Sequence, residues 1–441
     1  MHIFEKTAVV GGVWRHHANA FSRVNSSEPS YRLPVASPQP NTNHSHHSEI
    51  LGDVLRLVRQ YQLSTRIHVG AQVASVSTLP APRAGTEGWV VAGSEVSSGA
   101  AFQLSCRLAV LCTNRRLGAP RHMELAGEAS FGGQVFRGLS GDVNNLQCAG
   151  QRVVVLGMGA FAIENMRTSF ERRASHIHVL CRRRGTVCPQ LVDWVNFVRP
   201  FDDEFKHDGA GDAVVLTHWH RAYDASGAHR PECWSSGLLK PDGHTVSVSD
   251  LFFIGHHMRM LSTACGEVGR LEGSSTVVTV GGGRLEAGVV IKCVGFELNE
   301  GNERLLGRAR MQSFGFASDG LWLLFEAHLD SHAFSSPFGS SYVNAASFNI
   351  KVMLRYWQSA ELGAGVTAAS SSQQLRSYRI NRLSVGDMLE GLGQLRPLDE
   401  GVSAILTDHV QQIAEAFEAT LPMEQYMAQN RRLWAVSHEL L

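Results

Sequence analysis

The stretch RVVVLGMGAFAIENMRTSFERRASHIHVLCRRR, residues 152–184, decides the fold of this chain. An apolar run at 153–156 ends in a glycine turn at 157–162, and the amphipathic pattern after the turn is typical of a helix. A second alternating apolar run at 177–180 ends in consecutive arginines. The order strand, glycine turn, helix and strand predicts the βαβ unit that binds a dinucleotide.

The small residues of the turn each have a physical role in such a unit. Gly157 permits the tight turn, and Gly159, which has no Cβ, lets the backbone approach a pyrophosphate. Ala162 lets the helix pack closely on the strand. The helix N-terminus then presents N–H groups and the positive end of its dipole to the phosphates. These positions form the predicted pyrophosphate site.

Three arginines stand where the second strand of an NAD-specific unit usually ends in an acidic residue. Arg182, Arg183 and Arg184 suit a 2′-phosphate, because a guanidinium forms charge-assisted hydrogen bonds with phosphate oxygens. The predicted cofactor is therefore NADP(H) and not NAD. The alternative is a glycine turn in some other α/β domain, beside a solvated basic cluster.

Length and composition limit the remaining possibilities. A chain of 441 residues is too long for one such unit and predicts two or three domains. Lys+Arg and Asp+Glu are both 40, so no global basic field points to nucleic acid. No apolar run reaches the ~18 residues that a membrane span needs, and the N-terminus lacks a signal-peptide layout. We expect a small-molecule ligand rather than a nucleic acid or a membrane.

Cysteine and histidine usage indicates a reduced protein without a metal. The eight cysteines are scattered and form no CxxC motif, which favours a cytoplasmic location. The 21 histidines include no HExxH motif and no paired Cys/His spacing. The sequence therefore predicts no metal site.

A β-meander that leads into a buried apolar strand occurs twice in the chain. The first copy comprises residues 72–76, 89–92, 101–104 and 108–114, and the second comprises residues 267–271, 276–280 and 289–295. Each final strand ends in Cys-x-(Asn/Gly), and Gly295 suits a positive φ beside a cofactor. Two copies predict an α/β protein with two Rossmann-like dinucleotide-binding domains, each with a β-meander, the second inserted in the first. Short strands with glycine turns also arise independently, and that alternative stays open.

The N-terminus has the pattern of an interrupted first domain. His2–Lys6 has the form of the second strand of a Rossmann unit, and Glu5 at its end would hold the ribose of an adenosine. Gly11–Trp14 is predicted to follow as a turn. In a complete unit a first strand, a glycine loop and a first helix, together ~30 residues, precede this strand. We therefore expect an incomplete cofactor site in this domain.

At these residues the chain resembles the flavin-containing monooxygenase family, including its Baeyer–Villiger relatives. The resemblance runs over about residues 1–355 and rests on FEK…GGVW at 4–14, Asn25-Ser26-Ser27, the turn at 157–162 and IKCVGFELN at 291–299. It implies FAD in the first domain and NADPH in the inserted one. The family's linker motif, FxGxxxHxxx(Y/F), is matched by Phe131 and Gly133, but Arg137 and Gly141 stand at its His and aromatic positions.

The resemblance also implies roles for single residues. Asn25 would help hold the flavin hydroperoxide, and the alternative for it is an ordinary turn residue. The GGxW segment would lie along the flavin, and a helix N-terminus near Ser341 would face the flavin ring. Outside the 157–162 turn and the arginines, the expected cofactor-binding residues are Glu5, Lys6, Gly11, Gly12, Trp14, Gly295 and Ser341.

The implied domain organisation has four segments. The FAD-binding domain would comprise residues 1–145 and 285–358, and the NADP-binding domain would comprise residues 150–284. Residues 359–441 would form a C-terminal helical extension. The first strand, glycine loop and helix would be missing from the FAD-binding domain.

This layout predicts an NADPH-dependent flavoprotein monooxygenase that inserts one oxygen atom from O2 into an amine, a sulfide or a ketone. The alternative is a truncated or degenerate, non-catalytic NADP(H)-binding protein of the same fold. A flavin-dependent disulfide reductase shares the plan but needs a redox cysteine pair that the sequence lacks. Without the FAD glycine loop, we expect NADPH binding without flavin retention.

Exchange of both Arg182 and Arg183 for alanine should remove most of the preference for NADPH over NADH. Pairing of one or two arginines with a 2′-phosphate is worth ~1.5–3 kcal/mol, which corresponds to a preference of about 10- to 150-fold. Titration of both nucleotides against the unchanged and the double-variant protein measures this preference. Full discrimination by the double variant would show that other residues hold the phosphate.

Overall fold

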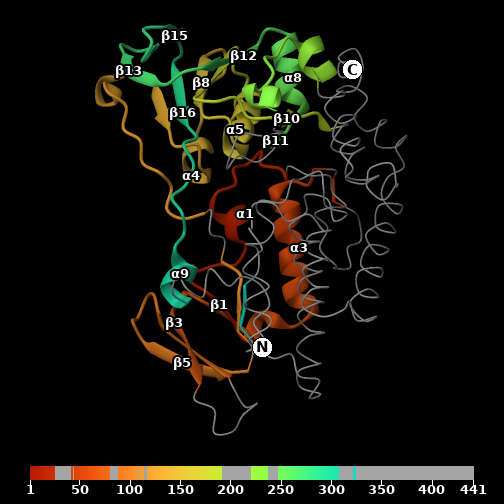
Figure 1. The fold of residues 1–441 in the computed structure, drawn as a ribbon, viewed down its shortest axis with the longest axis vertical. Helices are drawn as coiled ribbons and strands as arrows, with labels where there is room; N and C mark the ends of the chain where they lie inside the picture. The colour runs from red at the N-terminus through yellow and green to blue at the C-terminus, as the bar shows by residue number, and fades with distance from the viewer. Residues whose placement is uncertain are drawn as a thin grey trace, which may run out of the picture.

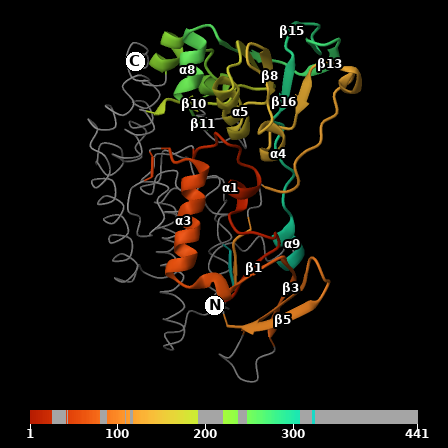
Figure 2. The same ribbon diagram turned by 180° about the vertical axis from the view of Figure 1, so that it is seen from behind.

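The computed structural model describes residues 1–24, 41–42, 44–79, 88–107, 109–113, 117–190, 220–236, 247–306 and 321–323. These residues form two groups of elements, as Figures 1 and 2 show from opposite sides. One group, the sheet lobe, comprises the described residues of 117–298. The other, the N-terminal lobe, comprises those of 1–113 together with 299–306 and 321–323. No helix in the described ranges is long and apolar enough to cross a membrane.

A parallel sheet of five strands is the centre of the sheet lobe. Its strand order is β12-β9-β8-β16-β7, and every neighbouring pair is parallel. The strands are β7 (Gln134–Phe136), β8 (Arg152–Leu156), β9 (His176–Cys181), β12 (Leu261–Cys265) and β16 (Val289–Lys292). The chain forms β9 on one side of β8 and β16 on the other, which makes a topological switch point at β8.

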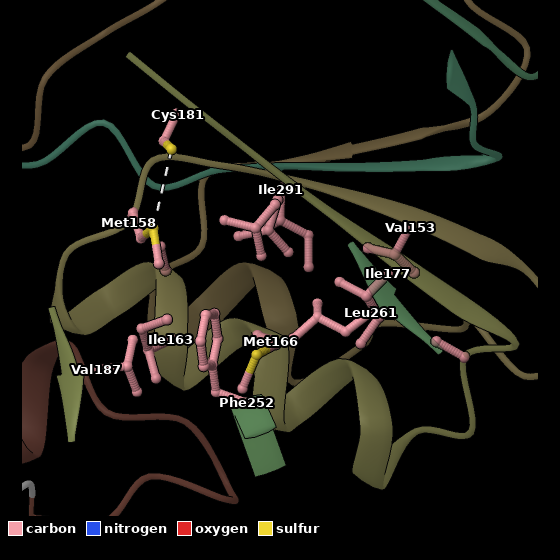
Figure 3. Close-up of a cluster of buried hydrophobic side chains, with 14 of the residues drawn as sticks. Val153, Met158, Ile163, Met166, Ile177, Cys181, Val187, Phe252, Leu261 and Ile291 are labelled. Carbon is pink, nitrogen blue, oxygen red and sulfur yellow. Dashed lines mark hydrogen bonds between the residues drawn. The ribbon is translucent and has the colours of Figure 1, made fainter. Parts of the chain in front are cut away.

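Two helices cover one face of this sheet, α5 (Ala160–Glu171) and α8 (Asp250–His257). Side chains of a strand point to alternate faces, so Val153 and Ile177 both face the helices. They pack with Met166 of α5 and Phe252 of α8 in one buried cluster (Figure 3). The predicted strand–turn–helix–strand unit is therefore present as β8, α5 and β9.

An antiparallel meander covers the other face of the sheet. It consists of β13 (Val268–Glu272), β14 (Thr276–Thr279) and β15 (Arg284–Glu286). Leu271 and Val277 of the meander pack against Val154 of β8 and Val290 of β16. Both faces of β8 and β16 are thus buried, which explains why these strands are continuous apolar runs in the sequence.

The N-terminal lobe contains a second meander, which the sequence predicts. The meander is β3 (Ala71–Leu79), β4 (Gly88–Glu95) and β5 (Ala101–Cys106), all antiparallel. Two parallel pairs lie beside it: β1 (Ile3–Glu5) with β2 (Ile67–Val69), and β6 (Ala109–Leu111) with β17 (Leu321–Leu323). The lobe also holds α1 (Gly12–His16), α3 (His47–Gln60), the 3-10 turn Leu63–Thr65 and α9 (Gly301–Leu306).

The sheet lobe also contains several shorter elements. They are the pair β10 (Val187–Cys188) and β11 (Ser247–Val248), the helix α4 (Ser140–Val143), and the 3-10 turns η2 (Glu128–Ser130) and η4 (Glu232–Ser236). The two chain segments that join the lobes run side by side. Gly118 N donates to Glu297 O at 2.9 Å, and Arg121 N donates to Gly295 O at 3.0 Å.

Strand pairing corrects the domain boundaries expected at 145 and 285. β7 ends before the first boundary and β16 begins after the second, yet both belong to the sheet that contains the βαβ unit. The physical reason is burial, because all four residues of β16 are buried between β8, β7, the helices and the meander. An apolar pattern in the sequence predicts a buried strand, but it does not identify the sheet to which the strand belongs.

Two further expectations concern the chain ends. The segment expected as a turn at Gly11–Trp14 is instead the start of helix α1, which begins at Gly12 with Gly11 as its N-cap. Gly11 and Gly12 have φ values of 126° and 51°, so the backbone that favours glycine extends from the N-cap into the first residue of the helix. The C-terminal extension expected at 359–441 lies outside the described residues.

Truncation of Ile177 to alanine should destabilise the sheet lobe. Its side chain is 0% exposed and packs under α5 and α8, so a cavity would remain, at a cost of about 2–5 kcal/mol. Val280→Ala is the control, because that side chain is 72% exposed in the turn after β14. Thermal unfolding followed by circular dichroism should show a lower transition temperature for Ile177→Ala alone. Equal shifts for both variants would contradict the assigned core.

Candidate dinucleotide site at the carboxyl edge of the sheet

The glycine turn after β8 lies between the carboxyl ends of two neighbouring strands. Gly157 has a φ of 101°, which disfavours any residue with a side chain. Its N–H donates to Leu180 O at the end of β9, at 2.9 Å. A Cβ at this position would lie 2.5 Å from Cys293 O, just after β16. Glycine is therefore required here by both the backbone conformation and the space.

The second glycine of the turn has a different environment. Gly159 is the N-cap of α5 in an extended conformation, with φ −85° and ψ −175°. Among the described residues, a Cβ placed on it would meet no atom within 4 Å, and no side chain caps the helix. The space beside Gly159 and the first N–H groups of α5 can therefore receive an anionic group. Ala162 is fully buried and packs close to Gly157, which brings the helix against the strand.

A small pocket lies beside this turn. Phe161 in the first turn of α5 stands on one side and the segment after β16 on the other, where Gly295 has a φ of 82°. The ring centroid of Phe296 lies 5.2 Å from that of Phe161 and 5.0 Å from that of His17 of the N-terminal lobe, and both pairs of rings are tilted. The pocket is lined by Pro120, Arg121, Arg137, Gly138, Leu139, Phe161, Lys292, Cys293, Val294, Gly295 and Phe296.

Asn165 of α5 holds three segments of this edge together. Its Nδ2 donates to Gly138 O at 2.9 Å and to Phe161 O at 2.7 Å, and it lies 3.4 Å from Cys293 Sγ. Burial raises the pKa of the Cys293 thiol to about 12, so the thiol is neutral at physiological pH. Sequence reasoning missed Asn165, although a polar residue between the apolar Ile163 and Met166 was a signal for it.

Lys292 is a second residue that sequence reasoning missed. It is 8% exposed, and its Nζ donates to Glu128 at 2.7 and 2.9 Å and to Met123 O at 2.8 Å. Burial by itself would raise the pKa of Glu128, but hydrogen bonds from Lys292 and from Leu125 N lower it below its usual value. The pair ties the segment before β7 to the end of β16. A lysine inside an apolar run was the available signal.

The three arginines after β9 occupy different environments. Arg184 forms an ion pair with Glu232 of η4, and its side chain is 18% exposed. Arg182 is 76% exposed, and its Nε lies 3.9 Å from Glu267 Oε1. Arg183 is also exposed. The sequence treated these residues as equivalent, whereas in the structure Arg184 is largely covered in its ion pair and the other two arginines are exposed.

The N-terminal lobe contains the residues expected at the flavin. Glu5 at the end of β1 accepts hydrogen bonds from Thr7 N and Thr7 Oγ1, both at 2.8 Å. Lys6 and Gly12 are exposed, and Trp14 is half-buried. A Cβ on Gly12 would meet no atom of the described residues within 4 Å, so in this part of the structure the backbone is open to a ligand. Asn25 and Ser341 lie outside the described residues.

Polar contacts hold the residues before position 25 against the sheet lobe. Asn19 Nδ2 donates to Thr168 Oγ1 of α5 at 3.0 Å, and Ala20 N donates to Asn144 Oδ1 at 3.2 Å. The Arg172 guanidinium lies 5.3 Å from the ring centroid of Phe21. These contacts place the start of the predicted flavin-side segment beside the helix that begins at the glycine turn.

Comparison with known proteins shows a partial likeness in sequence and a broader likeness in fold. No family model matches the chain. A stretch of 209 residues is 25% identical to the FAD-binding monooxygenase VdtE of Byssochlamys spectabilis, and it covers 46% of this chain and 35% of that relative. The chain thus spans about a third of the length of this curated relative.

Solved structures share the fold over most of the chain. An oxidised steroid monooxygenase bound to NADP superposes with a TM-score of 0.60 at 13% identity, covering 94% of this chain and 93% of that one. A cyclohexanone monooxygenase with ε-caprolactone gives 0.57 at 13% identity, with the same shares covered. OTEMO in complex with FAD and NADP gives 0.55 at 14% identity, covering 82% and 81%. The chain therefore resembles these FAD- and NADP-binding monooxygenases in fold, as its motifs predict.

Glu164 on α5 should make the stability of this region depend on pH. Burial raises the pKa of Glu164 to about 7, although Arg167 and hydrogen bonds from Ser22 and Arg23 N oppose the shift. The folded state thus holds a proton that the unfolded state loses at lower pH, so this group reduces stability as pH rises from about 4.5 to about 7. Glu164→Gln should flatten this dependence in thermal unfolding scans.

The matched control for this measurement is Glu171→Gln, which changes an exposed carboxylate at the end of the same helix. It should leave the pH dependence of the transition temperature as in the unchanged protein. Parallel profiles for the unchanged protein and Glu164→Gln would contradict a raised pKa at Glu164.

Proposed function

We propose that this chain is an NADPH-dependent flavoprotein monooxygenase, which uses O2 to oxidise a small molecule. The observation that carries the proposal is the glycine turn at 157–159, which stands at the carboxyl edge of the parallel sheet beside the exposed arginines. In open α/β sheets this edge, at the switch point, is where dinucleotides bind. The likeness in fold to monooxygenases solved with FAD and NADP supports the same reading.

The residues around the turn fit a bound NADPH. Gly159 leaves open space where the pyrophosphate would approach, and the uncapped N-terminus of α5 supplies N–H donors to it. Arg182 and Arg183 are exposed at the end of β9, where the adenosine ribose of a dinucleotide lies in this fold. Phe161 and Gly295 line the small pocket beside the turn, and the Phe161 and Phe296 rings of this pocket lie near His17 of the N-terminal lobe.

The N-terminal lobe is the proposed FAD side. Glu5 would hold the adenosine ribose, and Gly11, Gly12 and Trp14 would lie along the flavin. The open backbone at Gly12 supports this placement, as does the contact of residues 17–21 with α5. When bound, FAD and NADPH supply the hydride and oxygen-transfer chemistry. The chain's own task is to orient them and exclude water, and we propose Asn25 as the hydrogen-bond donor at the site of oxygen transfer.

The proposed architecture is an NADP-binding lobe inserted into an FAD-binding lobe. Two observations support it. The segments that enter and leave the sheet lobe pair with each other at Gly118 and Glu297. After that lobe, Leu321–Leu323 pairs in parallel with Ala109–Leu111, which precedes it in the sequence. In the described residues, the chain thus leaves the N-terminal lobe before Gly118 and returns to it after Glu297.

The proposed substrate class is a soft nucleophile, an amine or a sulfide, or a ketone. Oxygen transfer of this type requires no acid–base dyad, because the oxygen donor is the cofactor. The similar fold of a cyclohexanone monooxygenase favours the ketone among these classes. None of the eight cysteines, all of which are described, forms a disulfide, and we propose a cytoplasmic location.

The second candidate is a non-catalytic NADP(H)-binding protein of the same fold. Arg137 lines the pocket at the position where the family's linker motif has His, and this departure favours the alternative. Such a protein would bind NADPH through the same turn and arginines. It would neither hold flavin nor consume NADPH.

Replacement of Gly159 by alanine should weaken NADPH binding without unfolding the protein. The added methyl group meets no protein atom but occupies the space of the pyrophosphate, so affinity should fall at least about tenfold. The melting temperature should change little, because the φ of −85° suits alanine. Gly157→Ala is the contrast, since its Cβ would clash with Cys293 O and cost about 1–3 kcal/mol of stability.

The flavin part of the proposal is tested on the same protein. Because an incomplete FAD site should retain flavin weakly, the assay keeps FAD in excess, and under this condition the chain should oxidise NADPH in the presence of a test sulfide or cyclic ketone. NADPH binding without NADPH oxidation, even with FAD in excess, would support the non-catalytic candidate. If Gly159→Ala binds NADPH as tightly as the unchanged protein, the dinucleotide binds elsewhere.

A further inference from the structure

Glu232 places a carboxylate among the arginines that follow β9. Its Oε2 accepts a hydrogen bond from Arg184 N at 3.3 Å, and its Oε1 pairs with the Arg184 guanidinium. Cys265 Sγ, at the end of β12, donates to Oε1 at 3.4 Å. The residue comes from η4, which is distant in sequence, yet its carboxylate lies at the ends of two neighbouring strands of the sheet.

This contact changes the charge that a ligand meets at the end of β9. The Arg184 side chain is 18% exposed and already has a carboxylate partner, whereas the Glu232 side chain is 54% exposed. Arg182 also has a carboxylate nearby, that of Glu267 at 3.9 Å. Burial by itself would raise the pKa of Glu232, but backbone hydrogen bonds, Cys265 and Arg184 lower it, so the carboxylate is ionised at neutral pH.

We propose that Glu232 is a specificity-determining residue of the dinucleotide site. Its carboxylate holds Arg184 away from a 2′-phosphate and opposes the negative charge of that phosphate. The same carboxylate can accept a hydrogen bond from a ribose 2′-hydroxyl, the interaction that acidic residues make in NAD-specific units. The chain would then prefer NADPH only moderately and keep affinity for NADH.

This inference rests on the proposed NADPH site and adds an opposing group to it. Two charges 4 Å apart in water interact by about 1 kcal/mol, which corresponds to about a fivefold change in affinity. Glu232 is exposed to water, so its interaction with a 2′-phosphate should be of this size. It should shift the preference between NADPH and NADH without abolishing the binding of either. Arg182 and Arg183 remain the residues that favour the phosphate.

The test compares two adenosine fragments, 2′,5′-ADP and 5′-AMP, which differ only in the 2′-phosphate. Glu232→Gln keeps an acceptor for Arg184 N and removes the charge. Isothermal titration calorimetry should show the ratio of 2′,5′-ADP to 5′-AMP affinity rise roughly fivefold to tenfold. The ratio of NADPH to NADH affinity should rise in the same direction. Structural damage would weaken both ligands of a pair and leave each ratio unchanged.

Glu286→Gln is the matched control. Glu286 is also an exposed carboxylate paired with an arginine, Arg152, at 3.6 Å, but it stands at the amino end of β8. The ratio of 2′,5′-ADP to 5′-AMP affinity in Glu286→Gln should equal that of the unchanged protein. In an Arg184→Ala background, Glu232→Gln should still raise the ratio, because removal of the negative charge does not require Arg184.

The outcomes separate this inference from the proposed function. An unchanged ratio in Glu232→Gln overturns the role of Glu232 while the NADPH site stands. A lowered ratio also overturns it and shows that Glu232 instead positions Arg184 to bind the phosphate. If the unchanged protein binds neither fragment and neither dinucleotide, the NADPH site and the role of Glu232 both fail.

Discussion

The rest of the structure depends on the close approach of three backbone segments at Gly157. The N–H of this residue bonds to the carbonyl that ends β9, and its Cα faces the carbonyl of Cys293 after β16. Cys293 N in turn donates to Leu156 O at 3.0 Å. A side chain at this point would separate the strands and lift α5 from the sheet, so the turn that positions the helix also joins the switch point. The candidate pyrophosphate position exists because the backbone here is compact.

Buried polar groups stabilise this edge where apolar packing ends. Lys292 and Glu128 neutralise each other at the end of β16, and Asn165 bonds to carbonyls of α5 and of the segment after β7. A buried ion pair contributes little net stability against a well-packed apolar pair, but loss of one partner leaves an uncompensated charge. Such contacts define where the linking segments lie, and those segments form the walls of the pocket. The shape of the pocket thus depends on the contacts that hold these segments in place.

The charge at the other end of the site is set by partners distant in sequence. Three consecutive arginines suggest one strongly basic surface, yet Glu232 lies 48 residues from Arg184 and pairs with it. Sequence position did not reveal this pair, because no local pattern relates η4 to the end of β9. Recognition of a phosphate at this point therefore depends on the balance between exposed arginines and a nearby carboxylate. The balance is a property of the folded chain.

The sequence by itself determined the βαβ unit, both meanders and the need for glycine at 157 and 295, because strand periodicity and backbone φ are local properties. It also indicated the fold of the FAD- and NADP-binding monooxygenases through short motifs. It did not determine that β7 and β16 join the sheet of β8, or that Gly12 starts a helix. Tertiary structure decided these features and the partners of Lys292 and Arg184. The physical reason is that an apolar strand or a charged side chain is compatible with several partners, and only the packing of distant segments selects one.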